Sequence, residues 1–367
     1  MQHQASGRLF EAVSVGAIAL RNRIVMAPLT RSRASPLGVP AAFAVDYYAQ
    51  RAGAGLLITE ASQISFEGMG YPRTAGIHEA RQLAAWKAIV DAVHARGSRI
   101  VVQLWHVGRI AHRLNRGHDA DVVAPSAIRA PGQIWTDQQG MQDHDMPRAL
   151  ESDEIARIAL EYAAAARNAI DTGFDGVELH SANGYLLHQF LSSNVNRRTD
   201  RYGGSIANRV RMPLQALDAV VAEVGAERTG LRISPGHTFN DIAEDDMAEL
   251  YAHYLGELEK RHLAYLHVMR PFANTIDQDV VALVRAHYRG KLMVCGGYDH
   301  DSAAAVVAQG DADAVAFGRA FISNPDLVER MRAGAPLAEA DQATFYTPGE
   351  KGYTDYPPMS ARVTAGA

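Results

Sequence analysis

The segment Gly176-Val-Glu-Leu-His-Ser-Ala-Asn-Gly-Tyr185 contains the densest group of side chains that could do chemistry. His180 and Asn183 can both donate hydrogen bonds to one oxygen, which polarises a carbonyl or nitro group and stabilises a developing enolate. Tyr185 stays protonated at neutral pH, because a tyrosine has an ordinary pKa of about 10, and it can donate a proton. The competing interpretation is a structural loop with Tyr185 in the core. For this segment taken alone, that interpretation is the stronger one.

Glycines and one arginine near the end of the chain form a second group. Gly296 and Gly297 follow one short apolar run, and Gly318 and Arg319 follow the next. Glycine lets backbone N–H groups approach an anion closely, and arginine supplies a forked cation. The paired placement favours a phosphate site over two ordinary turns with a surface arginine. Gly-x-Gly-x-x-Gly is absent, so we expect no dinucleotide-binding Rossmann domain.

Six polar residues also lie at the ends of apolar runs. A single histidine in such a place is usually a core residue, but six polar ends together favour a lined cavity. Arg232 lies within Leu231-Arg-Ile, and a charge there needs a partner. An anionic cofactor ring is one candidate, and the carboxylate of Glu178 is the other. The six residues are Thr30, Gln103, His106, His180, Arg232 and His267.

Eight short apolar runs can position these side chains. They lack polar alternation, as parallel strands covered on both faces do. The runs are Arg23–Met26, Gly55–Thr59, Arg99–Leu104, Gly176–Leu179, Gly230–Ile233, Ala264–Val268, Leu292–Cys295 and Asp313–Phe317.

Helical periodicity separates the strands. Apolar residues recur at helical spacing in 83–93, 155–170 and 206–221. We expect Gly97 to be a helix C-cap and Ser152 an N-cap. Pro213 should kink or delay the third of these helices.

The alternation predicts an α/β protein, a (β/α)8 TIM barrel, with a doubly wound open sheet as the structural alternative. Residues 10–20 should form a hairpin that caps the bottom of the barrel. The long segment 107–149 follows the third strand and should overhang the catalytic face. No composition shift marks a second domain, so we expect residues 1–367 to form a single domain.

Composition narrows the class of protein. The formal net charge is −5, with 36 Lys and Arg against 41 Asp and Glu, which argues against a nucleic-acid surface. The single cysteine, Cys295, excludes an internal disulfide and a cysteine-ligated iron–sulfur cluster. We find no leader-like apolar segment and no membrane-spanning run, so we expect a cytoplasmic protein with no membrane partner. The oligomeric state stays open.

Other site chemistries are less well supported. His180 and His188 are close in sequence, but no His-Glu-x-x-His or His-x-His pattern appears, and we expect no metal. A flavin-free phosphate-binding lyase or aldolase is the second hypothesis. It lacks an obvious Schiff-base lysine, because Lys291 opens a strand at the wrong end of the barrel. A non-catalytic binding protein is the third hypothesis, and the many polar strand ends disfavour it.

Six segments together resemble the Old Yellow Enzyme family of ene-reductases, which depend on flavin mononucleotide (FMN). The resemblance runs from Leu9 to Pro357, and its segments stand in the family's order. They are Asn22-Arg-Ile-Val-Met-Ala-Pro-Leu-Thr-Arg31, Gln103-Leu-Trp-His-Val-Gly-Arg109, Gly173-Phe-Asp-Gly-Val-Glu-Leu-His-Ser-Ala-Asn-Gly-Tyr185, Arg198-Thr-Asp-Arg-Tyr-Gly-Gly-Ser205, Phe317-Gly-Arg-Ala-Phe-Ile-Ser-Asn-Pro-Asp326 and Gly352-Tyr-Thr-Asp-Tyr-Pro357.

The resemblance implies an NAD(P)H-dependent oxidoreductase that reduces the activated C=C bond of α,β-unsaturated carbonyl or nitro compounds. Reduced nicotinamide, with NADPH as the expected donor, would give hydride to FMN N5, and an electron-poor alkene would then receive it. His180 and Asn183 would hold the substrate's carbonyl or nitro oxygen, and Tyr185 would protonate the α-carbon. Tyr71, Trp105 and Tyr346 would shape the substrate pocket.

The resemblance also implies contacts to non-covalent FMN. Thr30 would bond near the flavin O4, Arg232 would lie beside N1 and the C2 oxygen, and Arg319 would hold the phosphate. The remaining contacts implied are Pro28, Leu29, Ala61, Gln103, Gly296, Gly297 and Gly318.

Three positions place the chain within the family or depart from it. Thr30 stands where one subgroup has a flavin-tuning cysteine, so the chain looks more like the classical subgroup of N-ethylmaleimide and xenobiotic reductases. His188 stands where family members commonly carry an acid, and Pro235-Gly-His-Thr238 is unusual. Both departures put substrate preference in doubt more than reaction type.

Overall fold

A computed structural model describes residues 7–116, 121–271 and 279–359 and shows a closed barrel of eight parallel strands. The expected (β/α)8 barrel is therefore confirmed, and the open doubly wound sheet is not formed. The barrel closes where β14 pairs with β3. The strands are β3 (Ile24–Met26), β4 (Leu56–Gln63), β5 (Arg99–Trp105), β10 (Gly176–Ser181), β11 (Thr229–Ile233), β12 (Tyr265–Met269), β13 (Leu292–Cys295) and β14 (Ala314–Phe317).

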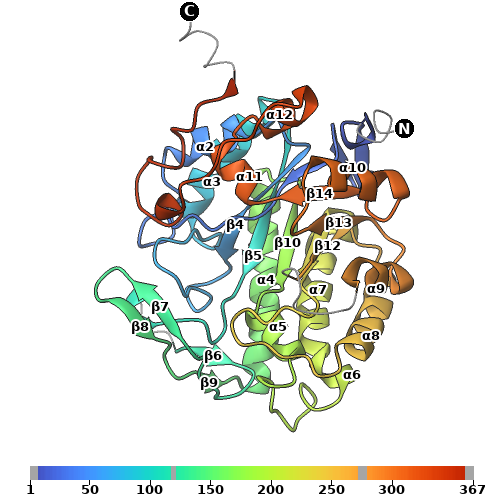
Figure 1. Cartoon of the computed structure of the whole chain (residues 1–367). Coiled ribbons are helices and arrows are strands. Elements are labelled where there is room, and N and C mark those ends of the chain that lie inside the picture. Colours follow the sequence, from blue (N-terminus) through green and yellow to red (C-terminus); the bar gives the residue numbers. More distant parts are fainter. Residues whose placement is uncertain (1–6, 117–120, 272–278, 360–367) are drawn as a thin grey trace, which may run out of the picture.

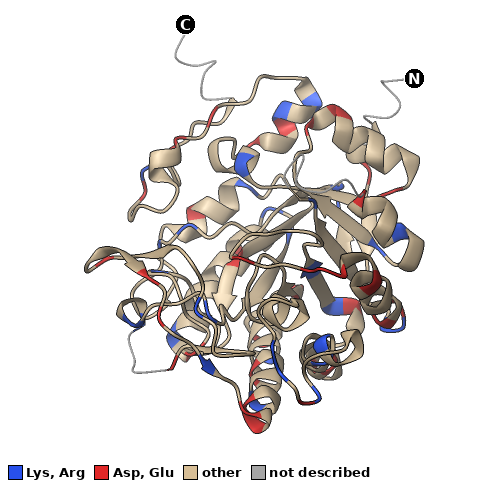
Figure 2. Cartoon of the chain, turned by 60° about the horizontal axis from the view of Figure 1, so that its bottom comes forward, with Lys and Arg blue, Asp and Glu red and all other residues tan. Residues whose placement is uncertain are grey.

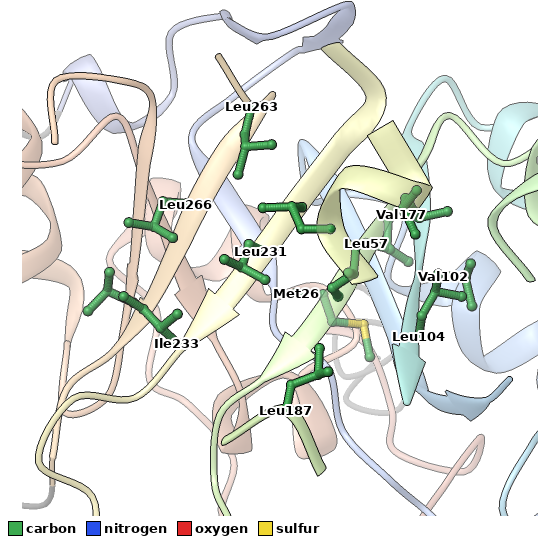
Figure 3. Packing of buried hydrophobic residues seen from close by; sticks show 14 of the residues in the cluster. Met26, Leu57, Val102, Leu104, Val177, Leu187, Leu231, Ile233, Leu263 and Leu266 are labelled. Carbon is green, nitrogen blue, oxygen red and sulfur yellow. The ribbon is translucent and has the colours of Figure 1, made fainter. Parts of the chain in front are cut away.

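Alternate residues of each strand face the helices or the barrel interior. Met26, Leu57, Val102, Val177 and Leu231 belong to the large cluster under the helices (Figure 3). A second cluster fills the lower barrel interior and is formed by Val25, Leu56, Ile58, Val101, Tyr265, Met293 and Ala314, among others. Since the side chains of a strand alternate between faces, later residues of the same parity also point inward.

The expected bottom cap is present. β1 (Val13–Val15) and β2 (Ile18–Leu20) form an antiparallel hairpin. Val15, Ile18 and Leu20 are buried against the lower interior cluster, so the hairpin closes the N-terminal end of the barrel. Chemistry is therefore confined to the opposite end.

Helices surround the barrel (Figure 1). Basic and acidic residues are interspersed along the helices and loops, as their near-equal totals suggest (Figure 2). No helix in the described ranges is long and apolar enough to cross a membrane. The helices are α2 (Ala44–Gln50), α3 (Ala80–His94), α4 (Ser152–Thr172), α5 (Leu186–Leu191), α6 (Ile206–Arg209), α7 (Arg211–Val224), α8 (Met247–Glu259), α9 (Val280–His287), α10 (His300–Gln309), α11 (Arg319–Ser323) and α12 (Leu327–Ala333).

Two predicted helix caps were wrong by one or two residues. Ser152 is the first residue of α4, and Glu151 is the N-cap, in a capping box with Glu154. The C-cap of α3 is Ala95, and Gly97 lies two residues later with a φ of +74°. The prediction for Pro213 is confirmed, because the helix is interrupted at Val210 and restarts as α7.

The segment after β5 forms two small sheets on one side of the molecule (Figure 1). β6 (Val123–Ala124) pairs with β9 (Arg148–Ala149), and β7 (Gln133–Thr136) forms a hairpin with β8 (Gly140–Asp143). Part of the expected overhang, residues 117–120, lies outside the described residues.

Candidate functional site

A polar layer lies in the barrel interior above the apolar cluster. The Gln103 amide Nε2 donates to Glu178 Oε1 at 2.7 Å, and His267 Nδ1 lies 2.9 Å from Glu178 Oε2. Burial alone would raise the pKa of Glu178, but His267, Arg232 and Gln103 outweigh it and hold the pKa below its ordinary value. Burial would likewise lower the pKa of His267, yet Glu178 raises it. Each group therefore favours the charged form of the other, and Glu178 fixes the orientation of the Gln103 amide.

Arg232 has no carboxylate partner among the described residues. Its Nη2 lies 3.0 Å from Met269 Sδ and 4.0 Å from Cys295 Sγ, and its buried Nε has no hydrogen-bond partner. Glu178, the carboxylate candidate, is hydrogen-bonded to Gln103 and His267 and makes no hydrogen bond with Arg232 among the described residues. A buried guanidinium with only sulfur contacts is left needing an acceptor.

The glycines after β13 and β14 have backbone conformations or packing that favour glycine. Gly296 and Gly297 have φ values of +102° and +73°. A Cβ on Gly296 would lie 3.0 Å from the Arg270 carbonyl oxygen, and one on Gly318 would lie 3.4 Å from Leu29 Cδ2. Arg319 is exposed and makes no hydrogen bond or ion pair with the residues that the structure describes. Its charge is therefore free to meet an anion.

The residues after β3 and in β4 lie at the same end of the barrel. Pro28, Leu29 and Thr30 follow β3 and are half-buried. Ala61 lies just after a register shift in β4, which begins at Ile58. Thr30 lines a cavity with Trp105 and Tyr185.

His180 lies on β10 and is almost fully buried. Its ring stacks against Trp105, with centroids 6.4 Å apart, and meets the Tyr185 ring edge-on at 5.0 Å. Burial, followed by the positive charge of Arg232, lowers the pKa of His180 well below its ordinary value. The imidazole is neutral at pH 7, and its buried Nδ1 has no partner among the described residues.

A tight turn after β10 brings Asn183 and Tyr185 beside His180. Asn183 has a φ of +55°, which is uncommon for a residue other than glycine. Its side chain makes no hydrogen bond with the described residues, whereas its backbone N–H donates to Ser234 Oγ at 2.8 Å. The hydroxyl of Tyr185 lies 3.3 Å from that of Tyr71. Burial raises the pKa of Tyr185 to about 12, so this group is a proton donor at neutral pH.

A cavity of about 790 Å³ opens over this turn. Tyr71, Trp105 and Tyr346, which the sequence placed at the substrate pocket, lie in its wall. His180 and Asn183 are not wall residues of this cavity. His180 lies next to the cavity wall, because its ring contacts the wall residues Trp105 and Tyr185.

Sequence reasoning missed the outer wall of this cavity. Trp135 and Met141 are cross-strand partners in the β7–β8 hairpin, and Phe239 comes from the loop after β11. All three are about half exposed, like Tyr346. We call these four side chains the apolar rim. Large apolar residues in an otherwise polar overhang were the available signal.

Arg73 joins the segments that carry the rim. It donates to the carbonyl oxygens of Ser32 and Tyr346 at 2.9 and 3.0 Å and pairs with Asp137 of the hairpin turn. The sequence offered no signal for Arg73, because its three partners lie far apart along the chain.

Of the six polar residues at strand ends, His106 was wrongly predicted to line the cavity. His106 is fully buried behind β5, where its Nδ1 accepts from the Gly108 N–H at 3.1 Å and its Nε2 lies 3.6 Å from Glu67 Oε1. Side chains alternate between the two faces along a strand, and His106 is an odd number of residues from Gln103 and Trp105. It therefore faces away from the barrel interior. No cluster of metal-ligating side chains is found in the described part of the chain, and His188 pairs with Glu244 instead.

The fold and site define a class of protein: a TIM barrel whose open end combines a buried unpaired arginine, glycine turns with a free arginine, and a pocket of neutral donors. Residues 8–338 match the model of the NADH:flavin oxidoreductase / NADH oxidase family. The chain belongs to this family, and the resemblance to the Old Yellow Enzyme family is confirmed. It is an FMN-dependent oxidoreductase.

Relatives cover nearly the whole chain. A probable flavin mononucleotide-dependent alkene reductase of Leishmania infantum is 43% identical, over 96% of this chain and 97% of its own length. The 12-oxophytodienoate reductase 1 of Oryza sativa subsp. japonica is 44% identical, over 95% and 92%. The structure of morphinone reductase in complex with tetrahydroNAD matches with a TM-score of 0.90 and 46% identity, over 96% and 97% of the two chains. The Old Yellow Enzyme homologue of Zymomonas mobilis matches with a TM-score of 0.92 and 40% identity, over 95% and 99%.

Proposed function

We propose that the chain is an NAD(P)H-dependent ene-reductase that reduces the activated C=C bond of α,β-unsaturated carbonyl or nitro compounds. The observation that carries this proposal is the neutral group of His180, Asn183 and Tyr185 in and after β10, in which Tyr185 lines an apolar pocket and the His180 ring contacts Tyr185. Two members can bond an oxygen, and the third is a weakly acidic proton donor.

The residues fit the implied cofactor. Arg232 supplies a buried cation without a carboxylate partner, as an electron-rich flavin edge requires. The Nε2 of Gln103 is used by Glu178, so its amide Oε1 is left to accept a hydrogen bond from a ring N–H. Gly296, Gly297, Gly318 and Arg319 would hold the phosphate. When bound, FMN accepts hydride from NAD(P)H and passes it to the β-carbon of the alkene.

His180 and Asn183 bind and polarise the substrate. A carbonyl or nitro oxygen that accepts hydrogen bonds from both would gain negative charge as hydride arrives, and the two donors would bond it more strongly then than before. Since His180 is neutral, it stabilises this oxygen without carrying a charge of its own. Tyr185 then gives its proton to the α-carbon.

The pocket supports substrates with an apolar body. A volume of about 790 Å³ exceeds the needs of a small cyclic enone, and the apolar rim covers its outer end. We also propose that residues 1–367 form one FMN-binding domain, because β3 and β14 close the barrel and the Gly352 carbonyl oxygen accepts from Arg31 Nη2 at 2.8 Å.

A two-stage assay tests the proposed function. The purified protein should bind FMN and turn yellow, bleach anaerobically with NADPH or NADH, and regain its colour on addition of an enone or nitroalkene. Protein that binds no FMN would overturn the proposal. Protein whose reduced flavin is reoxidised only by oxygen, and by no alkene in the panel, would limit the activity to that of an NAD(P)H oxidase.

A further inference from the structure

His188 is a buried histidine that the proposed reaction does not use. It is the third residue of α5, directly after the turn that carries Asn183 and Tyr185, and it is completely buried. Its Nδ1 accepts a hydrogen bond from the Gly184 N–H at 3.1 Å. The ring proton of the neutral imidazole must therefore lie on Nε2, which is 2.9 Å from Glu244 Oε1.

The side chain of Glu244 is only 2% exposed, and it connects the histidine to the loop after β11. Its Oε2 accepts from the Gly236 N–H at 3.0 Å, and its Oε1 also accepts from the Tyr251 hydroxyl at 2.9 Å. Within the described residues His188 is the only basic side chain that contacts it. The carboxylate thus joins α5, α8 and the segment Pro235-Gly-His-Thr238, where the sequence departs from the family pattern.

The loop after β11 also contacts the Asn183–Tyr185 turn directly, on its other side. Asn240 Nδ2 donates to the Asn183 carbonyl oxygen, and Ser234 Oγ accepts from the Asn183 N–H, both at 2.8 Å. A Cβ on Gly184 would lie 2.6 Å from the Phe239 carbonyl oxygen and from Asn240 Cβ. The positive φ of Asn183 is costly for a non-glycine residue, so contacts of this kind are needed to hold it.

We propose that His188 and Glu244 form a positioning pair that fixes the Asn183–Tyr185 turn in the geometry that receives the substrate oxygen and delivers the proton. This inference rests on the proposed function. The pair links both departures from the family pattern: a histidine replaces an acid at position 188, and the loop at 235–238 brings the N–H of Gly236 to the carboxylate that this histidine needs.

Three variants separate the contribution of His188 from that of Glu244. His188→Asn keeps an acceptor at the position of Nδ1 but cannot reach Glu244. His188→Leu keeps the bulk and removes both hydrogen bonds. Glu244→Gln keeps the shape and removes the charge. The matched control is His94→Asn, which breaks a His–carboxylate contact of 2.8 Å to Asp175 at the opposite end of the same strand, β10.

The readouts are FMN affinity, the affinity of the oxidised holoenzyme for p-hydroxybenzaldehyde followed by flavin absorbance, and the rate of alkene reduction. A phenol of this kind probes the oxygen-binding pair without turnover. We expect His188→Leu to weaken phenol binding about tenfold, equivalent to about 1.4 kcal/mol, and to slow alkene reduction by at least as much. FMN affinity should stay within twofold, because its proposed ligands lie on other strands.

The graded response distinguishes positioning from general destabilisation. His188→Asn should recover much of the phenol affinity, and Glu244→Gln should fall between the two. His94→Asn should lower the melting temperature and leave phenol affinity unchanged. The proposal is overturned if His188→Leu binds the phenol with wild-type affinity. If His188→Leu does not fold, wild-type phenol affinity in Glu244→Gln overturns it instead. Failure of the wild-type enzyme to reduce any alkene would instead reject the proposed function.

Discussion

Protonation decides what the side chains of the site can do. His180 and Tyr185 are both neutral at pH 7, since burial lowers the pKa of the imidazole and raises that of the phenol to about 12. In the proposed reaction, His180 and Asn183 therefore meet the substrate oxygen as donors that carry no net charge, and Tyr185 keeps the proton that it gives to the α-carbon. The buried cation Arg232 lies elsewhere, in the barrel interior beside Met269 and Cys295. Oxygen binding and charge compensation are thus assigned to different residues.

Tyr185→Phe tests the role of the proton donor. The variant should slow the oxidation of reduced enzyme by 2-cyclohexenone about 10²- to 10⁴-fold, the usual contribution of a positioned general acid. The rate of flavin reduction by NAD(P)H should change less than threefold, because that half-reaction needs no proton from this group. Anaerobic stopped-flow absorbance measures both. Equal slowing of the two half-reactions would reject the assignment.

Glu60 gives a second prediction at this scale, for stability. Burial, opposed by the Arg31 backbone and the charges of Arg31 and Arg33, raises its pKa from 4.5 to about 7. Between these values the folded protein holds a proton that the unfolded chain has lost, so stability falls as pH rises from about 4.5 to about 7. Glu60→Gln removes this dependence. The variant should match the wild type at pH 5 and be more stable at pH 8, by up to about 3 kcal/mol.

Melting temperatures of both proteins from pH 5 to pH 8 check this prediction. The difference between the two curves isolates Glu60, because every other group titrates in both proteins. A difference that does not vary with pH would show that Glu60 is ionised throughout this range.

At the scale of elements, the barrel strands were predictable and their interior network was not. Each strand is a short apolar run with both faces covered, and this local signal placed all eight within a few residues. Which residues meet inside the barrel depends on register. The shift in β4 between Ile58 and Ala61 is invisible in the sequence, and so is the pairing of Gln103 with Glu178. The prediction for His106 was wrong for the same reason, because the alternation of side chains between the two faces of β5 was not considered at the end of the strand.

The elements outside the barrel were harder to predict. The β7–β8 hairpin has no core of its own and is held by contacts such as Arg73 with Asp137, between residues far apart in sequence. The loop after β11 holds the Asn183–Tyr185 turn by hydrogen bonds to the Asn183 backbone, yet from sequence it was only an unusual stretch, Pro235–Thr238. His188 was noticed as a departure, but its partner Glu244 lies in that loop and no local pattern connects them.

The hairpin gives a prediction about substrate size. Trp135→Ser should raise the KM for an enone with a large apolar body, such as a steroid enone, about 3- to 10-fold, because roughly half of an indole face is lost to the ligand. The KM for 2-cyclohexenone should stay unchanged, since a small ring does not reach the rim. Met146→Ser is the control, an exposed residue of the same segment outside the cavity wall. Equal effects on both substrates would show that the rim does not contact the ligand.

At the scale of the whole molecule, the barrel interior is divided along its axis. The lower half is apolar and closed by the β1–β2 hairpin, which supplies stability. The upper half contains Gln103, Glu178, Arg232 and His267, all buried. Charges there cost free energy in the protein without cofactor unless they are paired. Glu178 and His267 are paired, but Arg232 has no carboxylate partner among the described residues, so we expect its guanidinium to destabilise an otherwise well-packed core locally.

Arg232→Met therefore separates stability from cofactor binding. In the FMN-free protein the substitution replaces a buried, unpaired guanidinium with an apolar chain of similar length, beside Met269 and Cys295, and should raise the melting temperature. The wild type should gain about 2.7 kcal/mol when FMN is present at 100 times its dissociation constant. The variant, with FMN affinity reduced about 100-fold, should gain less than about 0.5 kcal/mol at the same concentration.

The control is Arg99→Met, at the bottom end of β5, where the guanidinium is half exposed and paired with Asp175. It should change stability by no more than about 1 kcal/mol and leave the gain from FMN intact. Differential scanning fluorimetry of the wild type and the two variants, each with and without FMN, measures all of these quantities. If Arg232→Met lowers the stability of the FMN-free protein, then the Arg232 guanidinium has sufficient partners within the barrel itself. Its charge then does not require the flavin as a partner.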